Sequence, residues 1–121
     1  MKLLRIGVVG PCASGKTTLT AGLNQHGFDA RHIGQEHSYV ATMWQRITNP
    51  DILIYLTVSY PLTIARRKLD WTFGEYEEQL HRLRHAREHA NLLIDTDHLT
   101  PQEVLDQALS FLGKYPKRLD K

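Results

Sequence analysis

The sequence has very little cysteine and no long apolar run. Cys12 is the only cysteine among the 121 residues, which excludes an internal disulfide and a zinc cluster built from cysteines, and this usage is typical of reducing compartments. A membrane span needs roughly 20 apolar residues, and the first residues have neither the longer apolar core nor the cleavage site of a signal peptide. We therefore expect a cytoplasmic protein with no membrane partner.

A strong excess of one charge is also absent. The chain has 15 Lys and Arg against 13 Asp and Glu, for a formal net charge of +2. Acidic and basic residues are interleaved, and aromatic residues are not grouped with the arginines, so we rank a nucleic-acid role last. The length allows a single domain, residues 1–113, followed by a basic tail, residues 114–121, which we expect to be loosely ordered.

Apolar segments of strand length alternate with helical patterns along the chain. Strands are expected at 3–9, 28–34, 52–59 and 91–97. Helices are expected after residue 15 up to Gly27, from Tyr39 to about Thr48, from Pro61 to about Leu69, from Glu75 to about His89, and from a capping box at Thr100–Glu103 to Gly113. The alternation predicts a three-layer α/β/α fold with a small parallel sheet of about four strands. The partly polar segment 28–34 is expected at or near a sheet edge.

Between the first strand and the first helix, residues 10–17 read GPCASGKT and fit the pattern GxxxxGK[ST] at every fixed position. In this P-loop pattern the glycines let backbone N–H groups turn toward phosphate, and the helix N-terminus adds its positive dipole. We expect Lys16 to reach the β- and γ-phosphates and Thr17 to offer its hydroxyl to Mg²⁺. The expected nucleotide-binding residues here are Gly10, Pro11, Cys12, Ala13, Ser14, Gly15, Lys16, Thr17 and Thr18.

Cys12 and Arg87 each leave two interpretations open. Cys12 is either a variable loop position or a thiol whose oxidation blocks the nucleotide. At about 100° per residue, Arg87 shares a helix stripe with Tyr76 and Leu83, and Arg84 lies at the edge of that stripe. An arginine there either extends to solvent at the helix end or points at a phosphate.

With these motifs the chain resembles the P-loop kinase group that includes nucleoside, nucleoside monophosphate and shikimate kinases. The similar segments are 10–18, 50–67 and 82–104, which together cover much of the chain. The resemblance implies that Asp95, Thr96 and Asp97 hold the adenine largely through their backbone. It also implies that arginines neutralise the transferring phosphoryl group; the candidates are Arg66, Arg67, Arg82, Arg84 and Arg87.

The sequence departs from this group at two points. Thr57 stands where these kinases commonly carry Asp, and too few residues separate the first helix from the strand at Ile52 to hold an acceptor-binding domain. We infer that Glu36 replaces the missing carboxylate and orders water on Mg²⁺; the alternative is a solvated or capping glutamate. His37 is a weaker candidate for contacting an acceptor.

Three functions stay open on this basis. The favoured one is a small ATP-dependent phosphotransferase that uses ATP, or another NTP, with Mg²⁺ and acts on an unknown small-molecule acceptor. The second is an NTP hydrolase or switch, in which water is the acceptor. The third is a non-catalytic, nucleotide-responsive module whose shortened acceptor region became a surface for a protein partner.

Overall fold

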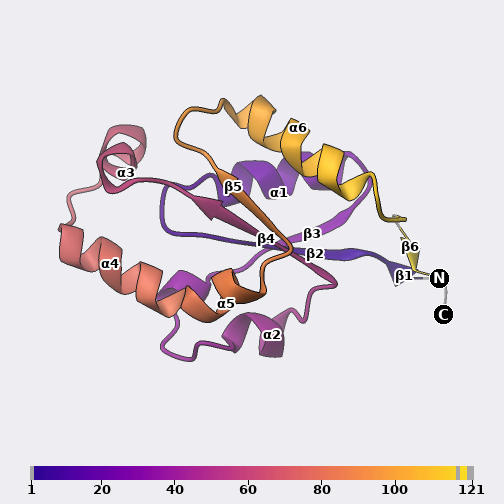
Figure 1. The fold of residues 1–121 in the computed structure, drawn as a ribbon, viewed down its shortest axis with the longest axis horizontal. Helices are drawn as coiled ribbons and strands as arrows, with labels where there is room; N and C mark the ends of the chain where they lie inside the picture. Colours follow the sequence, from indigo (N-terminus) through magenta and orange to yellow (C-terminus); the bar gives the residue numbers. More distant parts are fainter. Residues whose placement is uncertain (1, 117, 120–121) are drawn as a thin grey trace.

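The two central strands of the sheet form from strongly apolar runs of the chain, whereas one edge strand is partly polar. In the computed structural model, which describes residues 2–116 and 118–119, the strands β2 (Arg5–Val9), β3 (Asp29–His32), β4 (Ile52–Thr57) and β5 (Leu92–Asp95) form a four-stranded, all-parallel sheet (Figure 1). The strand order is β3-β2-β4-β5. The expected α/β class is therefore confirmed, and so is the place of residues 29–32 at the sheet edge beside the first strand.

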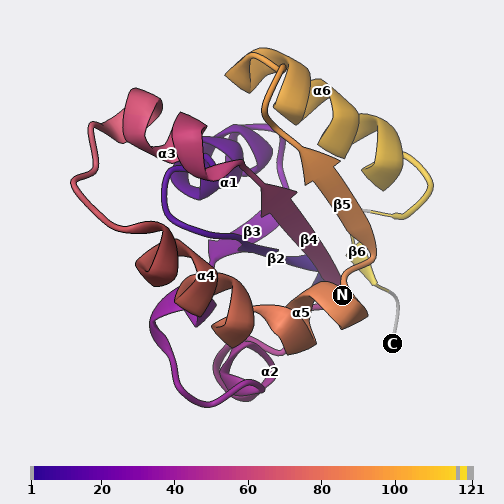
Figure 2. The ribbon, with the colours of Figure 1, turned by 60° about the vertical axis from the view of Figure 1, so that its left-hand side comes forward.

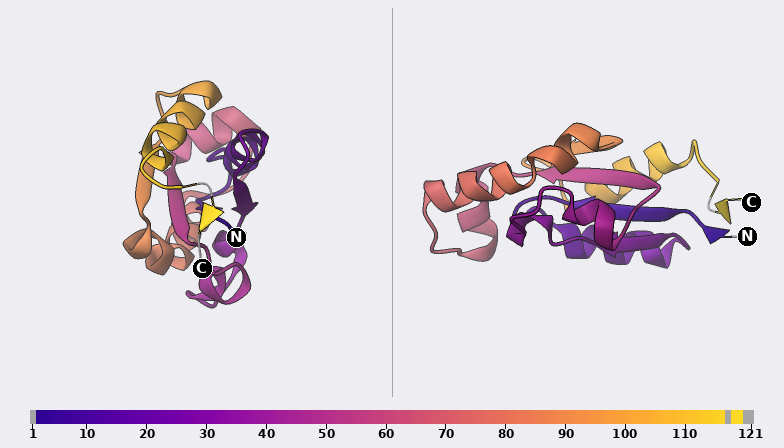
Figure 3. Two further views of the ribbon diagram at one scale, coloured as in Figure 1. Left: turned by 90° about the vertical axis from the view of Figure 1, so that its right-hand side faces the viewer. Right: turned by 90° about the horizontal axis from the view of Figure 1, so that it is seen from below.

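Helices connect the strands and cover the sheet on both faces (Figure 3). They are α1 (Lys16–Gln25), α2 (Met43–Ile47), α3 (Tyr60–Arg67), α4 (Phe73–Arg82), α5 (Arg84–His89) and α6 (Pro101–Leu112), with a 3-10 helix, η1 (Gln35–His37). The connections between parallel strands run through these helices, as parallel pairing requires. This arrangement is compatible with a three-layer α/β/α fold. Along the described residues, no helix is long and apolar enough to cross a membrane.

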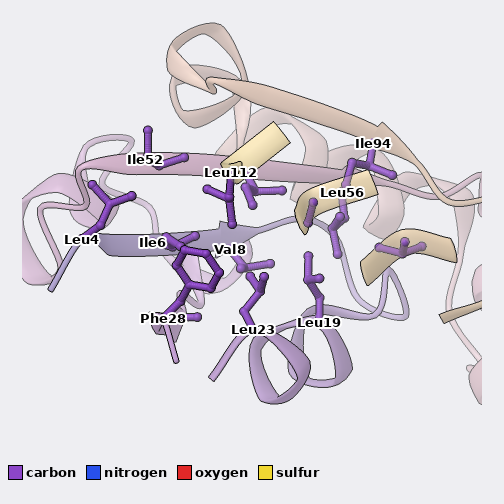
Figure 4. Packing of buried hydrophobic residues seen from close by; sticks show 14 residues of the cluster. Leu4, Ile6, Val8, Leu19, Leu23, Phe28, Ile52, Leu56, Ile94 and Leu112 are labelled. Atoms are coloured by element: carbon purple, nitrogen blue, oxygen red, sulfur yellow. The ribbon is translucent and has the colours of Figure 1, made fainter. Parts of the chain in front are cut away.

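Two hydrophobic clusters, one on each face, hold the layers together. The larger packs α1 and α6 on the sheet (Figure 4), and its buried members are Leu4, Ile6, Val8, Leu19, Leu23, Phe28, Ala30, Ile52, Ile54, Leu56, Ile94, Val104, Ala108 and Leu112. The smaller lies on the side of α2 and α5, with Val9, Ile33, Trp44, Leu53, Tyr55, Leu83 and Ala86. Since alternate residues of β4 point to opposite faces, this strand contributes to both clusters.

The structure corrects two of the expected helices. The helix expected from Tyr39 begins only at Met43, because the Ser38 hydroxyl bonds within its own turn, accepting from Val40 N at 3.1 Å, instead of capping a helix. The long helix expected from Glu75 to His89 begins earlier, at Phe73, and is divided at Leu83 into α4 and α5 (Figure 2).

The two ends of the chain also differ from expectation. The strand expected over residues 3–9 is divided at Leu4, so that β1 (Lys2–Leu3) stands apart from β2. β1 pairs antiparallel with β6 (Arg118–Leu119), and part of the tail expected to be loose is therefore a short strand. The remaining tail positions Lys117 and 120–121 lie outside the described residues.

Candidate functional site

The candidate site lies at the carboxyl ends of the parallel strands. β2 leads into the loop 10–15 and then α1, β3 leads into η1, and β5 leads into the loop 96–99. Ligands of open parallel sheets bind beyond these strand ends. The short β1–β6 pair lies at the opposite end of the molecule (Figure 1).

Two glycines shape the loop 10–15 for different reasons. A Cβ on Gly10 would lie 2.5 Å from the carbonyl oxygen of Leu56 and 2.7 Å from the Ser14 hydroxyl, so only glycine fits against β4. Gly15 has open space around its Cα but a φ of 96°, which side chains disfavour. Gly10 is thus required by close approach and Gly15 by backbone conformation.

Lys16 forms a buried ion pair at the base of this loop. Its Nζ donates to the carbonyl oxygens of Gly10 (2.8 Å) and Pro11 (3.0 Å) and lies 2.9 Å from Glu36 Oε2. The side chains of Lys16 and Glu36 are only 6% and 3% exposed. A charge this well buried is costly without its partner, so the two residues hold η1 against the loop.

Two histidines interact electrostatically with this ion pair. His37 Nε2 lies 3.6 Å from Glu36 Oε2, and the His37 side chain is largely exposed. Partial burial, and then the charge of Lys16, lower the pKa of His32 from its ordinary value. The other carboxylate oxygen of Glu36, Oε1, is buried and has no hydrogen-bond partner among the described residues.

The N-terminus of α1 opens into the same region. Within the described part of the chain, no side chain caps this helix at Gly15, and Thr17 and Thr18 are exposed. The N–H groups of a first helical turn have no partners inside the helix, and they carry the positive end of its dipole. This end of the site is therefore suited to an anion.

At the other end of the site, Arg66 ties α3 to two loops. Its Nη1 donates to Thr96 Oγ1 (2.9 Å) and Ala13 O (3.3 Å), and its Nη2 donates to Thr96 O (2.5 Å). The Thr96 hydroxyl donates in turn to the carbonyl oxygen of Thr57 at 2.7 Å. These bonds hold the loop 96–99 next to the loop 10–15.

A cleft of about 700 Å³ joins the two ends of the site. It is lined by Cys12, Ala13, Ser14, Gly15, Lys16, Thr17, Thr18, Leu19, His32, Glu36, His37, Arg66, Arg67, Thr96, Leu99, Pro101 and Val104. Its volume is within the range of small-molecule and cofactor sites. The fold thus brings together residues that the sequence assigned to one site, namely most of the loop 10–15, Glu36, Arg66 and Thr96.

Other predicted residues lie outside the lining of this cleft. Arg84 and Arg87 are exposed; Arg84 Nη1 donates to His81 O at 2.7 Å, and Arg87 Cζ lies 5.7 Å from the centre of the Tyr55 ring. Gly10 and Pro11 form the base of the loop and accept from Lys16.

Asp95 and Asp97 likewise stabilise the chain beside the cleft. Asp95 Oδ1 accepts from the N–H of Asp97 at 3.1 Å, and Asp97 Oδ1 accepts from the N–H of Ser59 at 2.8 Å. Both carboxylates thus bond to the backbone of the loops that follow β4 and β5, and only Thr96 of this triplet lines the cleft.

Gln79 is a residue that the sequence reasoning missed. It is buried on α4, where its Oε1 accepts from Cys12 N at 2.9 Å and its Nε2 donates to Cys12 Sγ at 3.1 Å. The apolar residues of this helix alone predict a buried stripe, and Gln79 is polar. Gln79 lies three residues after Tyr76 and four before Leu83, and this spacing was the available signal that it faces inward.

Comparison with known proteins leaves the family of this chain open. No family model matches the chain, and no curated protein matches it.

Proposed function

We propose that the cleft binds a nucleoside triphosphate with Mg²⁺, and that the protein is a small ATP-dependent phosphotransferase of the P-loop type. The observation that carries the proposal is the buried Lys16, which lies at the start of an uncapped helix with its ammonium surrounded by three oxygens. An ammonium, a free helix N-terminus and the Thr17 hydroxyl are the groups that a triphosphate with Mg²⁺ requires.

The Lys16–Glu36 pair suggests what changes when the nucleotide binds. Phosphate oxygens compete with Glu36 for the ammonium, because a charge-assisted bond to phosphate is as favourable as one to carboxylate. Glu36 is then free to accept hydrogen bonds from water on the Mg²⁺ that Thr17 would hold, since protein-bound Mg²⁺ usually keeps several waters.

The nucleobase is assigned to the end of the cleft opposite the phosphate groups. Arg66 fixes the backbone of Thr96 beside Ala13, so the peptide groups of Thr96 are held next to the loop 10–15. Backbone groups held this rigidly can recognise the edge of a base without any specific side chain. ATP or another nucleoside triphosphate is the expected ligand.

NTP hydrolysis coupled to a switch is a second candidate, favoured by the position of η1. Glu36 of η1 contacts Lys16, and Gln35 Nε2 donates to the carbonyl oxygen of Arg82 at 3.2 Å. A γ-phosphate that draws Lys16 away from Glu36 would release η1. Because Gln35 of η1 bonds to Arg82 at the end of α4, this change would be passed to α4. Water would then be the acceptor, and loss of the γ-phosphate would reset η1.

Binding is tested by calorimetric titration of ATP, GTP and ADP with Mg²⁺ into the wild type, Lys16→Ala and Lys114→Ala. Lys114 is an exposed lysine outside the cleft and serves as the control. A charge-assisted hydrogen bond contributes about 1.5–3 kcal/mol, so Lys16→Ala is expected to weaken ATP binding about 10- to 100-fold. Absence of binding by all three nucleotides would reject the proposal.

Turnover separates the candidate functions. ADP formation is measured with Mg²⁺–ATP alone and with a panel of small alcohols, nucleosides and acids. Stimulation by one acceptor supports the phosphotransferase, whereas an equal rate with and without acceptors, lost in Lys16→Ala, supports the hydrolase. Binding without turnover under either condition identifies a nucleotide-responsive binding module and contradicts both enzymatic functions.

A further inference from the structure

We propose that Cys12, Glu36 and His37 form a binding site for a thiophilic divalent metal such as Zn²⁺. One ligand atom from each residue, a sulfur, a carboxylate oxygen and an imidazole nitrogen, lies within 4.8 Å of the other two. Cys12 comes from the loop 10–15, and the other two residues come from η1. This inference goes beyond the proposed function, because the site needs no nucleotide.

The ligand set determines which metal fits. Thiolate and imidazole select zinc and related transition metals, whereas Mg²⁺ takes oxygen ligands. Three protein ligands with a fourth position open to water is the arrangement of catalytic zinc sites. The Mg²⁺ assigned to Thr17 under the proposed function is therefore chemically distinct from this metal.

Glu36 supplies an independent sign of a missing ligand. Its side chain is 3% exposed, and Oε2 is paired with Lys16 at 2.9 Å. Oε1 is buried without a hydrogen-bond donor among the described residues. A buried carboxylate oxygen with no donor is costly, and a metal ion bound through Oε1 would satisfy it, whereas Oε2, which lies 3.6 Å from His37 Nε2, is already paired with Lys16.

The surroundings of Cys12 and His37 allow both side chains to bind the metal. Gln79 Nε2 donates to Cys12 Sγ at 3.1 Å, and such a bond orients the sulfur. The His37 side chain is 65% exposed, so its ring can turn toward the metal without disturbing the core. The ionised Cys12 and Glu36 with the Lys16 ammonium leave one net negative charge facing the cation.

Metal binding would join the loop 10–15 to η1 through coordination bonds. The metal takes the thiolate of Cys12, and the thiol proton passes to solvent. All three ligands line the cleft, so metal in this position would occupy space next to Lys16. The expected consequence is a loop held in its nucleotide-free arrangement.

Cobalt spectroscopy tests the site with the full-length, reduced protein and no nucleotide. Co²⁺ takes the place of Zn²⁺ and gives a near-ultraviolet charge-transfer band only when bound to a thiolate. Because Cys12 is the only cysteine, the band can arise at no other residue of this chain. We expect the band in the wild type, its absence in Cys12→Ser, and its displacement by added Zn²⁺.

Zinc calorimetry measures the contribution of His37. Removing even an outer-shell partner commonly costs 10- to 100-fold in metal affinity, so His37→Gln is expected to weaken Zn²⁺ binding at least about tenfold. His98→Gln is the matched control, since His98 is exposed and does not line the cleft. Glu36→Gln is expected to lose affinity too, with thermal unfolding checking that it remains folded.

Two results would overturn the assignment. One is the absence of a thiolate band with the wild type at saturating Co²⁺. The other is Zn²⁺ binding of equal affinity in the wild type, Cys12→Ser and His37→Gln, which would place the metal elsewhere, for example at the stacked rings of His85 and His89, whose centres are 4.2 Å apart.

Discussion

At the scale of single residues, the most consequential contact is the buried pair of Lys16 and Glu36. Its two side chains are almost fully removed from water, and each therefore depends on the other. Taking one charge away leaves the opposite charge buried and uncompensated, which is far more costly than removing both. The pair can therefore be tested for its contribution to stability as well as for ligand binding.

We predict that Lys16→Met destabilises the protein by about 3–5 kcal/mol, because the carboxylate of Glu36 remains buried without its cation. The double variant Lys16→Met/Glu36→Leu is expected to recover about 2 kcal/mol or more of this loss, since no charge is left in the site. Urea unfolding at neutral pH measures both. Equal stability of the single and double variants would show that the buried carboxylate is not the source of the cost.

A second residue-scale prediction concerns alkaline pH. Burial raises the pKa of Tyr55 from 10.0 to about 12. Between these two values the unfolded chain releases the phenol proton and the folded chain keeps it, so the contribution of Tyr55 to stability is complete below pH 10 and is lost as the pH rises toward about 12. Tyr55→Phe is expected to reduce the fall in stability across this interval.

Tyr39→Phe is the control for this measurement, because Tyr39 is 85% exposed. Urea midpoints of the wild type and both variants are compared from pH 9 upward. If Tyr39→Phe flattened the profile as much as Tyr55→Phe, the alkaline loss would not come from the buried phenol.

Single residues also show what sequence can and cannot reveal about the site. The special residues Gly10 and Gly15 were evident from the motif alone, because their spacing is local. The contacts of Lys16 with Glu36 and of Gln79 with Cys12 join positions far apart in the chain. Which long-range pairs meet depends on the register of packed elements, and no local pattern encodes this.

At the scale of elements, helix starts were predictable where the cap and the apolar pattern agree. The capping box of Thr100 and Glu103 was expected and is present. Thr72 and Glu75 form a second capping box at the start of α4, whereas the sequence pattern placed the start of this helix at Glu75. The helix expected from Tyr39 begins later, at Met43, because the Ser38 side chain forms a local turn instead of a helix cap.

We predict that removing these two caps has different consequences. Each Thr→Ala change loses about 1 kcal/mol of capping free energy. α6 places Val104, Ala108 and Leu112 in the core, so Thr100→Ala is expected to lower the global stability. α4 buries only Gln79, so Thr72→Ala is expected mainly to speed amide exchange within α4.

Urea unfolding and native-state hydrogen exchange distinguish the two outcomes, with Thr42→Ala as a control because the side chain of Thr42 makes no capping bond to α2. A fall in global stability of the same size for Thr72→Ala and Thr100→Ala would mean that α4 unfolds only together with the core.

At the scale of the whole molecule, the strand order converts separate segments into one site. The alternation of apolar runs was enough to predict a parallel sheet with helices on both faces. The strand ends then had to meet at one edge, whichever helices covered them. By contrast, the pairing of β1 with β6 joins the two ends of the chain through two residues each, which is too short a pattern to detect in a sequence.

Because the cleft is lined by residues from the loops after β2, β3 and β5 and from α3, a bound nucleotide is expected to stabilise the entire fold. At a free concentration about 100 times the Kd, Mg²⁺–ATP would add about 2.7 kcal/mol, which raises the melting temperature of a domain of this size by roughly 10 °C. Gly15→Ala is expected to lose this gain, because a Cβ disfavours the φ of 96° that Gly15 has in the loop 10–15. Gly74→Ala, on α4 and outside the cleft, should keep the full gain, and a Gly15→Ala variant with an undiminished shift would place the nucleotide elsewhere.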